Sequence, residues 1–197
     1  SVLLTFVALF FSKLIGLLLI IITVWVYYFF RDPERFSIDD DSYLVSPADG
    51  LITDVSERSG PEELRLENTS FTRVSIFMNV FNCHVNRVPT SCKIEEIYYK
   101  PGKFLNASLD KASEENERNF FKITSKKDNE EIIIVQIAGL IARRIVCDVE
   151  QGQDLKQGDR IGMIRFGSRV DMYFKNKKVL AKLGQNVIAG ESLIASE

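Results

Sequence analysis

A long apolar run at the start of the chain constrains its fold more than any other feature of the sequence. Val2–Phe30 contains few polar side chains, the exceptions being Thr5, Ser12, Lys13 and Thr23. The part after the lysine is 17 residues long, near the lower limit for a helix that crosses the hydrocarbon core of a bilayer. Together with the residues before the lysine, it predicts one longer tilted helix, or two short segments that enter the membrane and return. We expect residues 1–30 to be a membrane segment.

Aromatic and basic residues mark the end of this run. Trp25, Tyr27 and Tyr28 stand where an aromatic belt lies at a membrane–water interface, and Arg31 and Arg35 follow. Arginine just outside an apolar span favours the cytoplasmic side for the residues that follow. We therefore expect a protein of the cell (inner) membrane with its domain in the cytoplasm. A cleaved signal peptide is the alternative, but no small-residue cleavage site follows the run.

The remaining composition is that of a folded protein. Of 197 residues, 46% are hydrophobic and 26% are charged, which predicts one domain of ordinary size plus an appendage. The formal net charge of −2 does not point to nucleic acid, and we expect no such partner. From Arg143 to Lys178 there are nine basic and five acidic residues. This excess suits either a surface near anionic lipid or a solvated face of a β domain.

Cysteine and histidine usage limits the possible chemistry. Cys83, Cys92 and Cys147 are odd in number and lack CxxC spacing, which favours reduced thiols over a disulfide framework or a zinc site. His84 is the only histidine in the sequence. That excludes mechanisms that need two imidazoles, including ordinary His-rich metal sites, so we expect no metal.

After Pro33 the pattern becomes one of short strands and turns, which predicts a mainly β domain. Gly, Pro, Asn and Asp fill the turns. One polar helix is plausible around Ser108–Asn116. β-Branched and aromatic content predicts strands over Val45–Val55, Thr72–Asn79, Ile94–Tyr99, Phe120–Thr124, Glu131–Ala138, Arg143–Cys147, Arg160–Ile164 and Val170–Phe174.

An internal repeat narrows the architecture. Gly152–Asp159 recurs as Gly184–Glu191 at an offset of 32 residues, and each copy has Gly, an apolar residue three positions later, and then Gly followed by an acid. Glycine supplies the positive φ angles of tight hairpins, while the apolar residue fills the core between them. The pattern resembles the hairpin turns of barrel-sandwich hybrid domains, such as lipoyl and biotinyl carriers.

One functional hypothesis follows from this repeat alone, namely a membrane-tethered carrier or adaptor domain without catalysis. Such carriers present a modifiable lysine at a hairpin tip in a Met-Lys-Met-like context, and the sequence contains none. Adaptors carry long helical hairpins, which the sequence pattern does not predict here. The hypothesis is therefore kept as the alternative.

A series of short motifs favours an enzyme instead. The dipeptide Gly167–Ser168 is by itself a common turn, but it stands last in an ordered set. The set consists of Ser46–Gly50, Phe81–Pro89, Pro101–Phe104, Asn116–Arg118 and Gly162–Ser168. In order and spacing, these motifs resemble the phosphatidylserine decarboxylases, in particular their short bacterial and archaeal form. The resemblance covers nearly the whole chain, including the apolar N-terminus.

The resemblance implies a proenzyme that cuts itself between Gly167 and Ser168, giving chains 1–167 and 168–197. Ser168 would become a covalent pyruvoyl group, so that no external cofactor or metal is needed. The pyruvoyl ketone would form a Schiff base with the serine amine of a membrane phospholipid. Loss of CO2 would then give phosphatidylethanolamine. Residues 31–197 would form the decarboxylase domain, and the resemblance is compatible with a homo-oligomer.

The resemblance also assigns roles to residues. Asp49 matches the aspartate of the family's ADG motif, which implies a part in self-cleavage as the base or as the orienter of the base. His84 matches a histidine associated with decarboxylation, and its pKa range suits proton transfer near neutral pH. Longer bacterial members carry a second histidine where this chain has Arg87, which cannot act as the base at neutral pH. Either His84 serves both steps, which we favour, or Asp49 acts more directly with Arg87 as an electrostatic aid.

Arginines are the candidates for contact with the lipid head group. Arg87, Arg118 and Arg169 could bind its phosphate or carboxylate through forked hydrogen bonds. Surface solvation is the alternative for each of them.

Overall fold

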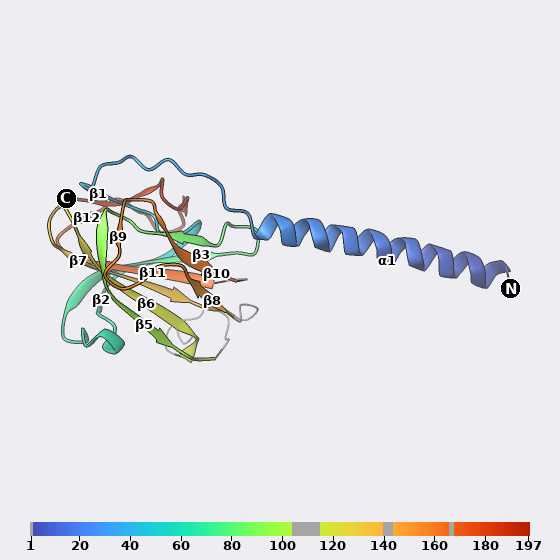
Figure 1. Ribbon diagram of the computed structural model, residues 1–197, viewed down its shortest axis with the longest axis horizontal. Coiled ribbons are helices and arrows are strands. Elements are labelled where there is room, and N and C mark those ends of the chain that lie inside the picture. Colours follow the sequence, from blue (N-terminus) through green and yellow to red (C-terminus); the bar gives the residue numbers. More distant parts are fainter. Residues whose placement is uncertain (1, 104–114, 140–143, 166–167) are drawn as a thin grey trace. The chain divides into compact units, whose positions relative to one another are not determined.

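The computed structural model describes residues 2–103, 115–139, 144–165 and 168–197, with the side chains of residues 2–6, 8 and 9 left out. The chain divides into two compact units, Ser1–Asp32 and Pro33–Glu197. Figure 1 shows the first as a helix and the second as a domain of strands.

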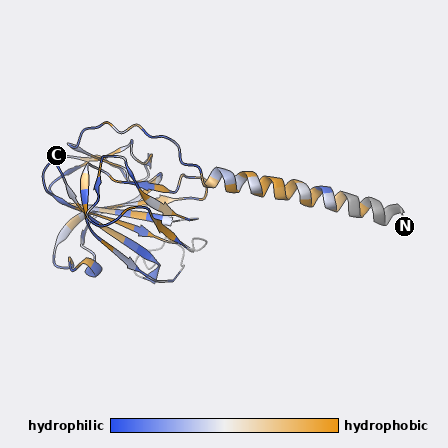
Figure 2. Ribbon diagram, viewed as in Figure 1, coloured by the Kyte–Doolittle hydropathy of each residue, from blue (hydrophilic) through white to orange (hydrophobic). Residues whose placement is uncertain are grey.

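The first unit consists mainly of α1 (Val2–Phe29). Its segment Phe10–Phe29 is long and apolar enough to cross a membrane, and Figure 2 shows α1 as predominantly hydrophobic. The described side chains from Phe10 to Ile22 are almost all exposed. An exposed apolar helix of this length is costly in water and stable in hydrocarbon. The predicted hydrophobic helical segment is confirmed.

Within its described residues, the second unit is built from antiparallel strands in three sheets. The largest sheet has the order β13-β2-β3-β11-β7-β6-β5-β9, and the two small ones are β1-β14-β12 and β4-β10-β8. The strands are β1 (Tyr43–Val45), β2 (Gly50–Ser59), β3 (Ser70–Met78), β4 (Val85–Arg87), β5 (Cys92–Lys100), β6 (Arg118–Ser125), β7 (Glu131–Ile137), β8 (Ile145–Cys147), β9 (Asp154–Leu155), β10 (Arg160–Ile164), β11 (Ser168–Phe174), β12 (Lys178–Val179), β13 (Asn186–Val187) and β14 (Leu193–Ser196). A short 3₁₀ turn, η1 (Glu62–Leu64), follows β2.

The centre of the large sheet is formed by β11 and β7. β11 pairs along its full length with β3, from Ser168 opposite Met78 to Phe174 opposite Thr72. On its other side it pairs with β7 from Arg169 to Tyr173. Every residue of β11 is buried. A strand that pairs on both sides and is covered on both faces is held by two backbone ladders and by packing at once.

The two faces of this sheet carry different clusters. Because side chains alternate along a strand, Val170, Met172 and Phe174 of β11 join the main core, whereas Tyr173 joins a smaller cluster on the other face. The main core also takes in side chains of the two small sheets, such as Ile161 and Ile194. Ser168 lies an even number of residues before Val170, Met172 and Phe174, so its side chain leaves the same face of the sheet as theirs.

The two repeat copies form equivalent turns at opposite edges of the large sheet. Gly152 and Gly158 have φ angles of 86° and 84°, and their counterparts Gly184 and Gly190 have 79° and 77°. The apolar residues between the glycines, Leu155 and Val187, are buried. The short strands of the two copies, β9 and β13, pair with β5 and β2 respectively. The repeat is therefore structural, as glycine spacing predicted.

Most of the predicted long strands are confirmed, and a mainly β domain is confirmed with them. The single strand predicted over Val45–Val55 is wrong, because a turn after Val45 separates β1 from β2. Ser46 Oγ donates to the carbonyl of Ala48 within this turn at 2.7 Å. The helix predicted around Ser108–Asn116 falls almost wholly outside the described residues. The likeness to hybrid domains stays a prediction.

Candidate active site

Ser168 lies at the first position of the central strand β11. It is fully buried and is directly opposite Met78 of β3. Within the described ranges, its hydroxyl has no hydrogen-bond partner. Burying a polar group without a partner costs about 1–3 kcal/mol, so a buried hydroxyl in this state needs an explanation, and a chemical role is one. Gly167, the other half of the bond expected to be cut, lies outside the described residues.

Asp49 lies at the same end of the large sheet as Ser168. β2 begins at Gly50, β3 ends at Met78 and β11 begins at Ser168, and these three strands are neighbours in antiparallel order. Adjacent strands lie about 4.8 Å apart, so the starts of β2 and β11 are about 10 Å apart. The sheet thus brings Asp49 towards Ser168, with one strand between them.

The Asp49 carboxylate has defined partners. Its Oδ1 accepts a hydrogen bond from the backbone N–H of Ala189 at 2.8 Å. Arg35 Nη2 donates to both carboxylate oxygens, at 2.8 Å and 3.2 Å. Asp49 is buried, and the Arg35 side chain is only 15% exposed. Sequence reasoning placed Arg35 only as a membrane-flanking charge and missed this contact, since nothing in the spacing of the two residues signals it.

The internal repeat provides a comparison for Asp49. In the first copy, Ser91 Oγ accepts from the backbone N–H of Gln157 at 3.3 Å. Gln157 and Ala189 occupy the same position of the two copies, 32 residues apart. Ser91 therefore accepts the hydrogen bond from the backbone N–H of Gln157 in the first copy, and Asp49 accepts the equivalent bond from Ala189 in the second. A hydroxyl is sufficient for this task, so the negative charge of Asp49 is not required by the turn.

His84 precedes β4, in the segment that follows β3. Its side chain is fully buried, and its backbone carbonyl accepts from Ile164 N at 3.2 Å. Ile164 is only four residues before Ser168, so this contact places His84 beside the chain that leads into β11. Nδ1 lies 3.0 Å from the carbonyl oxygen of Asn82. Because a carbonyl only accepts, Nδ1 carries the proton in the neutral ring and Nε2 is the basic nitrogen.

A chain of buried amides runs through the core near Ser168. Asn119 Nδ2 donates to Gln136 Oε1 at 3.4 Å, and Gln136 Nε2 donates to Asn86 Oδ1 at 2.8 Å. Asn86 Nδ2 in turn lies 3.6 Å from the sulfur of Met78, the residue opposite Ser168. All three amides are buried. Sequence analysis missed them, because the strand register that aligns them is not visible in the sequence.

Arg87 lies within the same half of the domain as Asp49 but is turned towards backbone oxygens. Nη1 donates to the carbonyl of Gly158 at 2.8 Å, and Nη2 donates to that of Pro33 at 3.1 Å. The residue is 6% exposed. These contacts join the segment after α1 to a turn of the repeat, so the hydrogen bonds of Arg87 have a structural role.

Arg169 and Ser168 are neighbours in β11, so their side chains leave opposite faces of the sheet. Arg169 forms a forked ion pair with Asp171, Nε to Oδ1 and Nη2 to Oδ2, both at 2.8 Å. Arg73 Nη1 also lies 3.9 Å from Asp171. Both Arg169 and Asp171 are buried, at 4% and 1% exposure. Burial first, and Asp171 second, raises the pKa of Tyr173 to about 12, which keeps its hydroxyl protonated at neutral pH.

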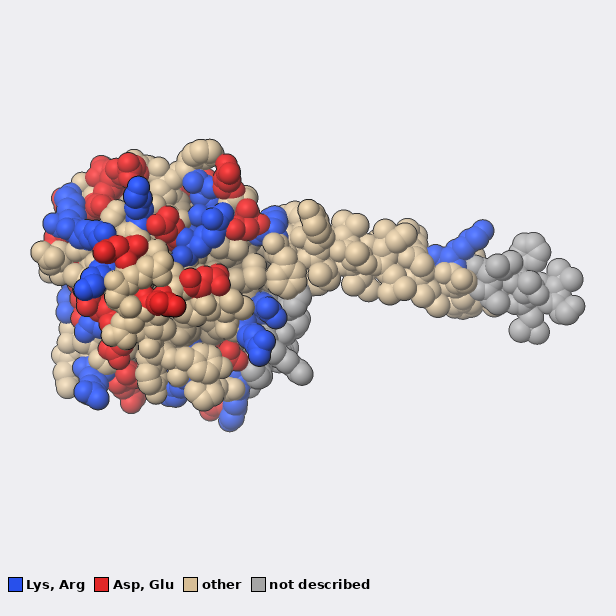
Figure 3. Space-filling view, viewed as in Figure 1, with Lys and Arg blue, Asp and Glu red and all other residues tan. Residues whose placement is uncertain are grey.

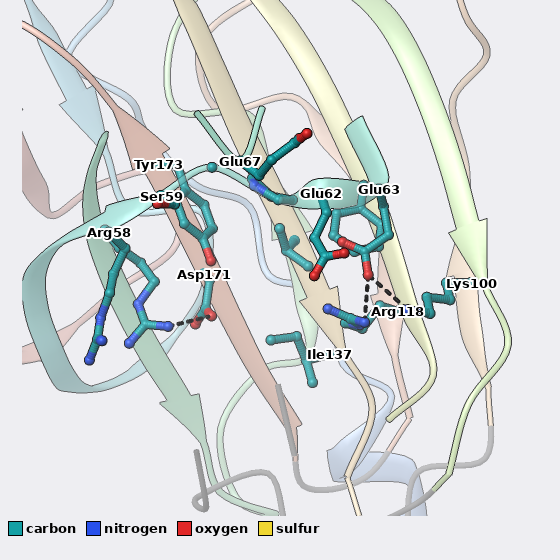
Figure 4. Close-up of a pocket in the computed structure, with 15 residues that line it drawn as sticks. Arg58, Ser59, Glu62, Glu63, Glu67, Lys100, Arg118, Ile137, Asp171 and Tyr173 are labelled. Carbon is teal, nitrogen blue, oxygen red and sulfur yellow. Dashed lines mark hydrogen bonds and ion pairs between the residues drawn. The ribbon is translucent and has the colours of Figure 1, made fainter. Parts of the chain in front are cut away.

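A cavity of about 640 Å³ opens on this second face of the sheet. Figure 4 shows Glu63 between Arg118 and Lys100. The Glu63 carboxylate accepts from Arg118 Nη2 at 2.7 Å and from Lys100 Nζ at 2.9 Å. Burial alone would raise the pKa of Glu63, but the hydrogen bond from Lys100 and the charge of Arg118 outweigh it and lower the pKa. Arg118 thus lies in a polar cavity across the sheet from Ser168.

The structure therefore divides the expected site residues into two groups. Ser168 and Asp49 lie at one end of the large sheet, and a backbone hydrogen bond joins His84 to Ile164, four residues before Ser168. Arg87 lies close to Asp49 in the fold, since its backbone N–H donates to the carbonyl of Pro47. Arg118 and Arg169 lie on the face of the large sheet opposite to Ser168. No group of three or more His, Cys, Asp or Glu is placed to hold a metal ion in the part of the chain that the structure describes.

Comparison with known proteins decides the family. The family model described as phosphatidylserine decarboxylase matches residues 22–195. The chain belongs to the phosphatidylserine decarboxylase family. It is 64% identical to the phosphatidylserine decarboxylase proenzyme of Pelagibacter ubique over 94% of this chain and 86% of that protein. Proenzymes of the same name from Rickettsia akari and Ruegeria pomeroyi are each 51% identical, over 94% and 88% of this chain and 80% of each protein.

Membership in the decarboxylase family suggests a chemical reason for the buried hydroxyl of Ser168. The relatives are named proenzymes, and proenzymes become active after a covalent change to the chain. Among the described residues near this end of the sheet, Ser168 carries a nucleophilic group, and His84 and Asp49 carry groups able to move protons.

Replacing Arg169 separates a framework role from a head-group role. In Arg169→Ala, the Asp171 carboxylate stays buried with Arg73 as its remaining close cation, so we expect the free energy of unfolding to fall by about 3–5 kcal/mol. Urea unfolding of the detergent-solubilised chain measures this. Arg58→Ala, an exposed arginine at the same cavity, is the control and should change it by less than about 0.5 kcal/mol. An unchanged unfolding free energy with a raised KM for phosphatidylserine would instead make Arg169 a head-group ligand.

Proposed function

We propose that this chain is the proenzyme of a phosphatidylserine decarboxylase and that it cuts itself between Gly167 and Ser168. The observation that carries the proposal is the Ser168 hydroxyl, fully buried at the start of the central strand and without a hydrogen-bond partner among the described residues. An unpartnered buried hydroxyl is costly in a merely structural position, but it suits a nucleophile that is consumed once. The family membership supplies the reaction.

The self-cleavage proceeds by ordinary serine chemistry. Ser168 Oγ attacks the carbonyl carbon of Gly167, and the peptide nitrogen leaves as an amine, so that the amide becomes an ester. Removal of the Ser168 Cα proton then expels the Gly167 carboxylate and forms a carbon–carbon double bond. The resulting enamine tautomerises to an imine, and water replaces its nitrogen. In sum, one water is consumed, one ammonia is released, and residue 168 becomes a pyruvoyl group.

The protons in this sequence need a carrier. We propose that His84 accepts the Ser168 hydroxyl proton at Nε2, since its Nδ1 is held by the Asn82 carbonyl. The carboxylate of Asp49 supplies negative charge at the same end of the sheet, fixed by Arg35 and the Ala189 N–H. With Arg87 hydrogen-bonded to backbone carbonyls, its proposed contribution is electrostatic.

The pyruvoyl group fits this position, because the hydroxyl it would derive from is buried and has no hydrogen-bond partner to lose among the described residues. At residue 168 it would supply a ketone able to react with the amino group of phosphatidylserine and to accept the electron pair released with CO2. Ser168 is fully buried by the described chain, which limits contact of this position with bulk solvent. His84 is the proposed group that returns a proton to the α carbon of the lipid head group. The head-group contacts expected of Arg87, Arg118 and Arg169 stay a prediction, since their described contacts serve the framework.

The two chains of the mature protein are expected to stay together. Residues 168–197 contain β11, which is paired on both sides within the large sheet, and β14, which lies between β1 and β12. The cut falls before the first residue of β11, so it takes from this strand only the backbone nitrogen of Ser168, which leaves as ammonia, and the pairing of Arg169–Phe174 is kept. The backbone pairing that folds the proenzyme also holds the small chain in place.

The apolar helix supports membrane association, which suits a phospholipid substrate. We propose the inner membrane as the location and the cytoplasmic side for the domain, on the basis of the arginines that follow the helix. No observation in the structure or the comparisons favours the alternative of a non-catalytic carrier or adaptor.

Ser168→Ala tests the nucleophile. We expect the variant to fold and to remain one chain, because alanine fits the buried position and lacks the attacking oxygen. Denaturing gel electrophoresis measures the outcome, with Ser196→Ala as a control that changes another serine of the small chain and should still be cut. A Ser168→Ala protein that divides into two chains would show that another residue starts the cleavage.

Asp49→Ser uses the internal repeat to separate turn capping from chemistry. Because Ser91 caps the equivalent turn, the variant should keep the bond to Ala189 N–H and fold, with its melting temperature lowered by the loss of the Arg35 ion pair. Loss of the carboxylate should slow self-cleavage about 10²-fold to 10⁴-fold, the range typical of a positioned acid–base group. A time course of chain cutting is the measurement, with Asp49→Asn as a second uncharged variant. Cutting at the parent rate would make Asp49 a cap only.

A further inference from the structure

The turn Asn79–Asn82 presents an aromatic ring to the surface. Phe81 is 63% exposed, although it lies between two buried strands, β3 and β4. The turn is fixed by its asparagines: Asn82 Oδ1 accepts from Asn79 N at 2.9 Å, and Asn79 Oδ1 accepts from Phe81 N at 2.8 Å. Asn82 N also donates to the carbonyl of Asn79 at 3.0 Å. A large apolar side chain held outward by a closed turn is placed to contact something apolar.

Two exposed arginines lie at the same end of the β4-β10-β8 sheet as this turn. β4 begins at Val85, β10 ends at Ile164 and β8 begins at Ile145, and antiparallel pairing aligns these three ends. Arg165 follows β10 and Arg144 precedes β8, and the two are joined by a backbone hydrogen bond of 3.2 Å. Both side chains are exposed. We call Phe81, Arg144 and Arg165 the rim.

Among the described residues, two acids near these segments have other hydrogen-bond or ion-pair partners. Glu117, which precedes β6, is 5% exposed, and its carboxylate accepts from the backbone N–H of Ile145 at 3.1 Å. Glu115 is paired with Lys103 at 3.1 Å. Figure 3 shows blue and red interleaved over the visible face of the domain, so that face carries no general excess of basic charge.

We propose that the rim docks the domain on an anionic phospholipid bilayer, with Phe81 in the acyl–headgroup boundary and Arg144 and Arg165 on lipid phosphates. An exposed aromatic flanked by arginine suits the interface between water and hydrocarbon. The inference rests on the proposed function, because Arg165 lies three residues before Ser168 and docking would bring a lipid head group to the site. The apolar helix keeps a membrane at high local concentration, so a weak contact is enough.

The test uses the full chain reconstituted in vesicles of phosphatidylcholine and phosphatidylglycerol. In a Trp25→Phe background, which removes the one native tryptophan, Phe81→Trp reports on the rim. Lys126→Trp is the matched control, since Lys126 is exposed and follows β6 at the far end of the large sheet from Ser168. Quenching by lipids brominated on the acyl chains and by aqueous iodide is measured for both reporters.

We expect the tryptophan at position 81 to be quenched by brominated lipid and shielded from iodide, and the one at position 126 to show the reverse. Changing Arg144 and Arg165 together to glutamine should lower the ratio of docked to undocked domain by roughly tenfold to thirtyfold, and high salt should act in the same direction. Equal exposure of both reporters to iodide, without quenching by brominated lipid, would overturn the proposal.

The outcome is separate from that of the proposed function. Self-cleavage of the parent chain is followed on the same samples by gel electrophoresis. A chain that is cut and decarboxylates detergent-solubilised phosphatidylserine, but whose position 81 stays in water, retains the proposed function and loses the docking rim. A chain that is not cut, but whose position 81 is in lipid, retains the rim and loses the proposed function.

Discussion

The pairing of β11 on both sides is the interaction on which the rest of the structure depends. This strand joins the halves of the large sheet through β3 and β7, and its first residue is the serine at which the chain is proposed to be cut. A break inside a central strand would cost ladder hydrogen bonds and packing. A break before its first residue takes only the backbone nitrogen of Ser168 and keeps the rest of the strand paired, and it puts the new chain end at the end of a central strand. The same backbone pairs thus position the nucleophile before cleavage and retain the small chain after it.

The internal repeat explains how Asp49 comes to this end of the sheet. Each copy uses two positive-φ glycines to turn the chain, and each turn has a backbone N–H that a side chain from the other part of the fold must satisfy. One half uses Ser91 and the other uses Asp49. The fold therefore places one capping side chain beside each turn, and of these two side chains only Asp49 is charged. Arg35, just after the membrane segment, holds that charge in place.

Much of the fold could be predicted from the sequence, because long strands rich in β-branched residues and glycine turns have local signals. The short strands β4, β9, β12, β13 and β14 were missed, since two to four residues cannot display an alternation. The turn after Val45 was read as strand, although Ser46 and Pro47 lie in it. For the site, motif order predicts Ser168, His84 and Asp49, and their roles stay a prediction. The buried chain from Asn119 to Asn86 depends on register between distant strands, which local patterns do not encode.

Arg169 shows where sequence reasoning could have gone further. An acid two residues later in a strand lies on the same face as the arginine, so the Arg169–Asp171 pair was readable from the spacing. Arg87 offered no such signal, because its partners are the carbonyls of Gly158 and Pro33, far away in the chain. The arginines that the sequence suggests as head-group ligands form hydrogen bonds and ion pairs within the domain in the structure.

The mass of the small chain tests the central claim most directly. If Ser168 is consumed as proposed, purified protein separated under denaturing conditions contains a chain of residues 168–197 that is lighter by one ammonia than the same peptide with an N-terminal serine, and that resists amino-terminal sequencing. An intact chain of 197 residues that decarboxylates phosphatidylserine at full rate would contradict the account, as would a small chain that begins with an unmodified serine.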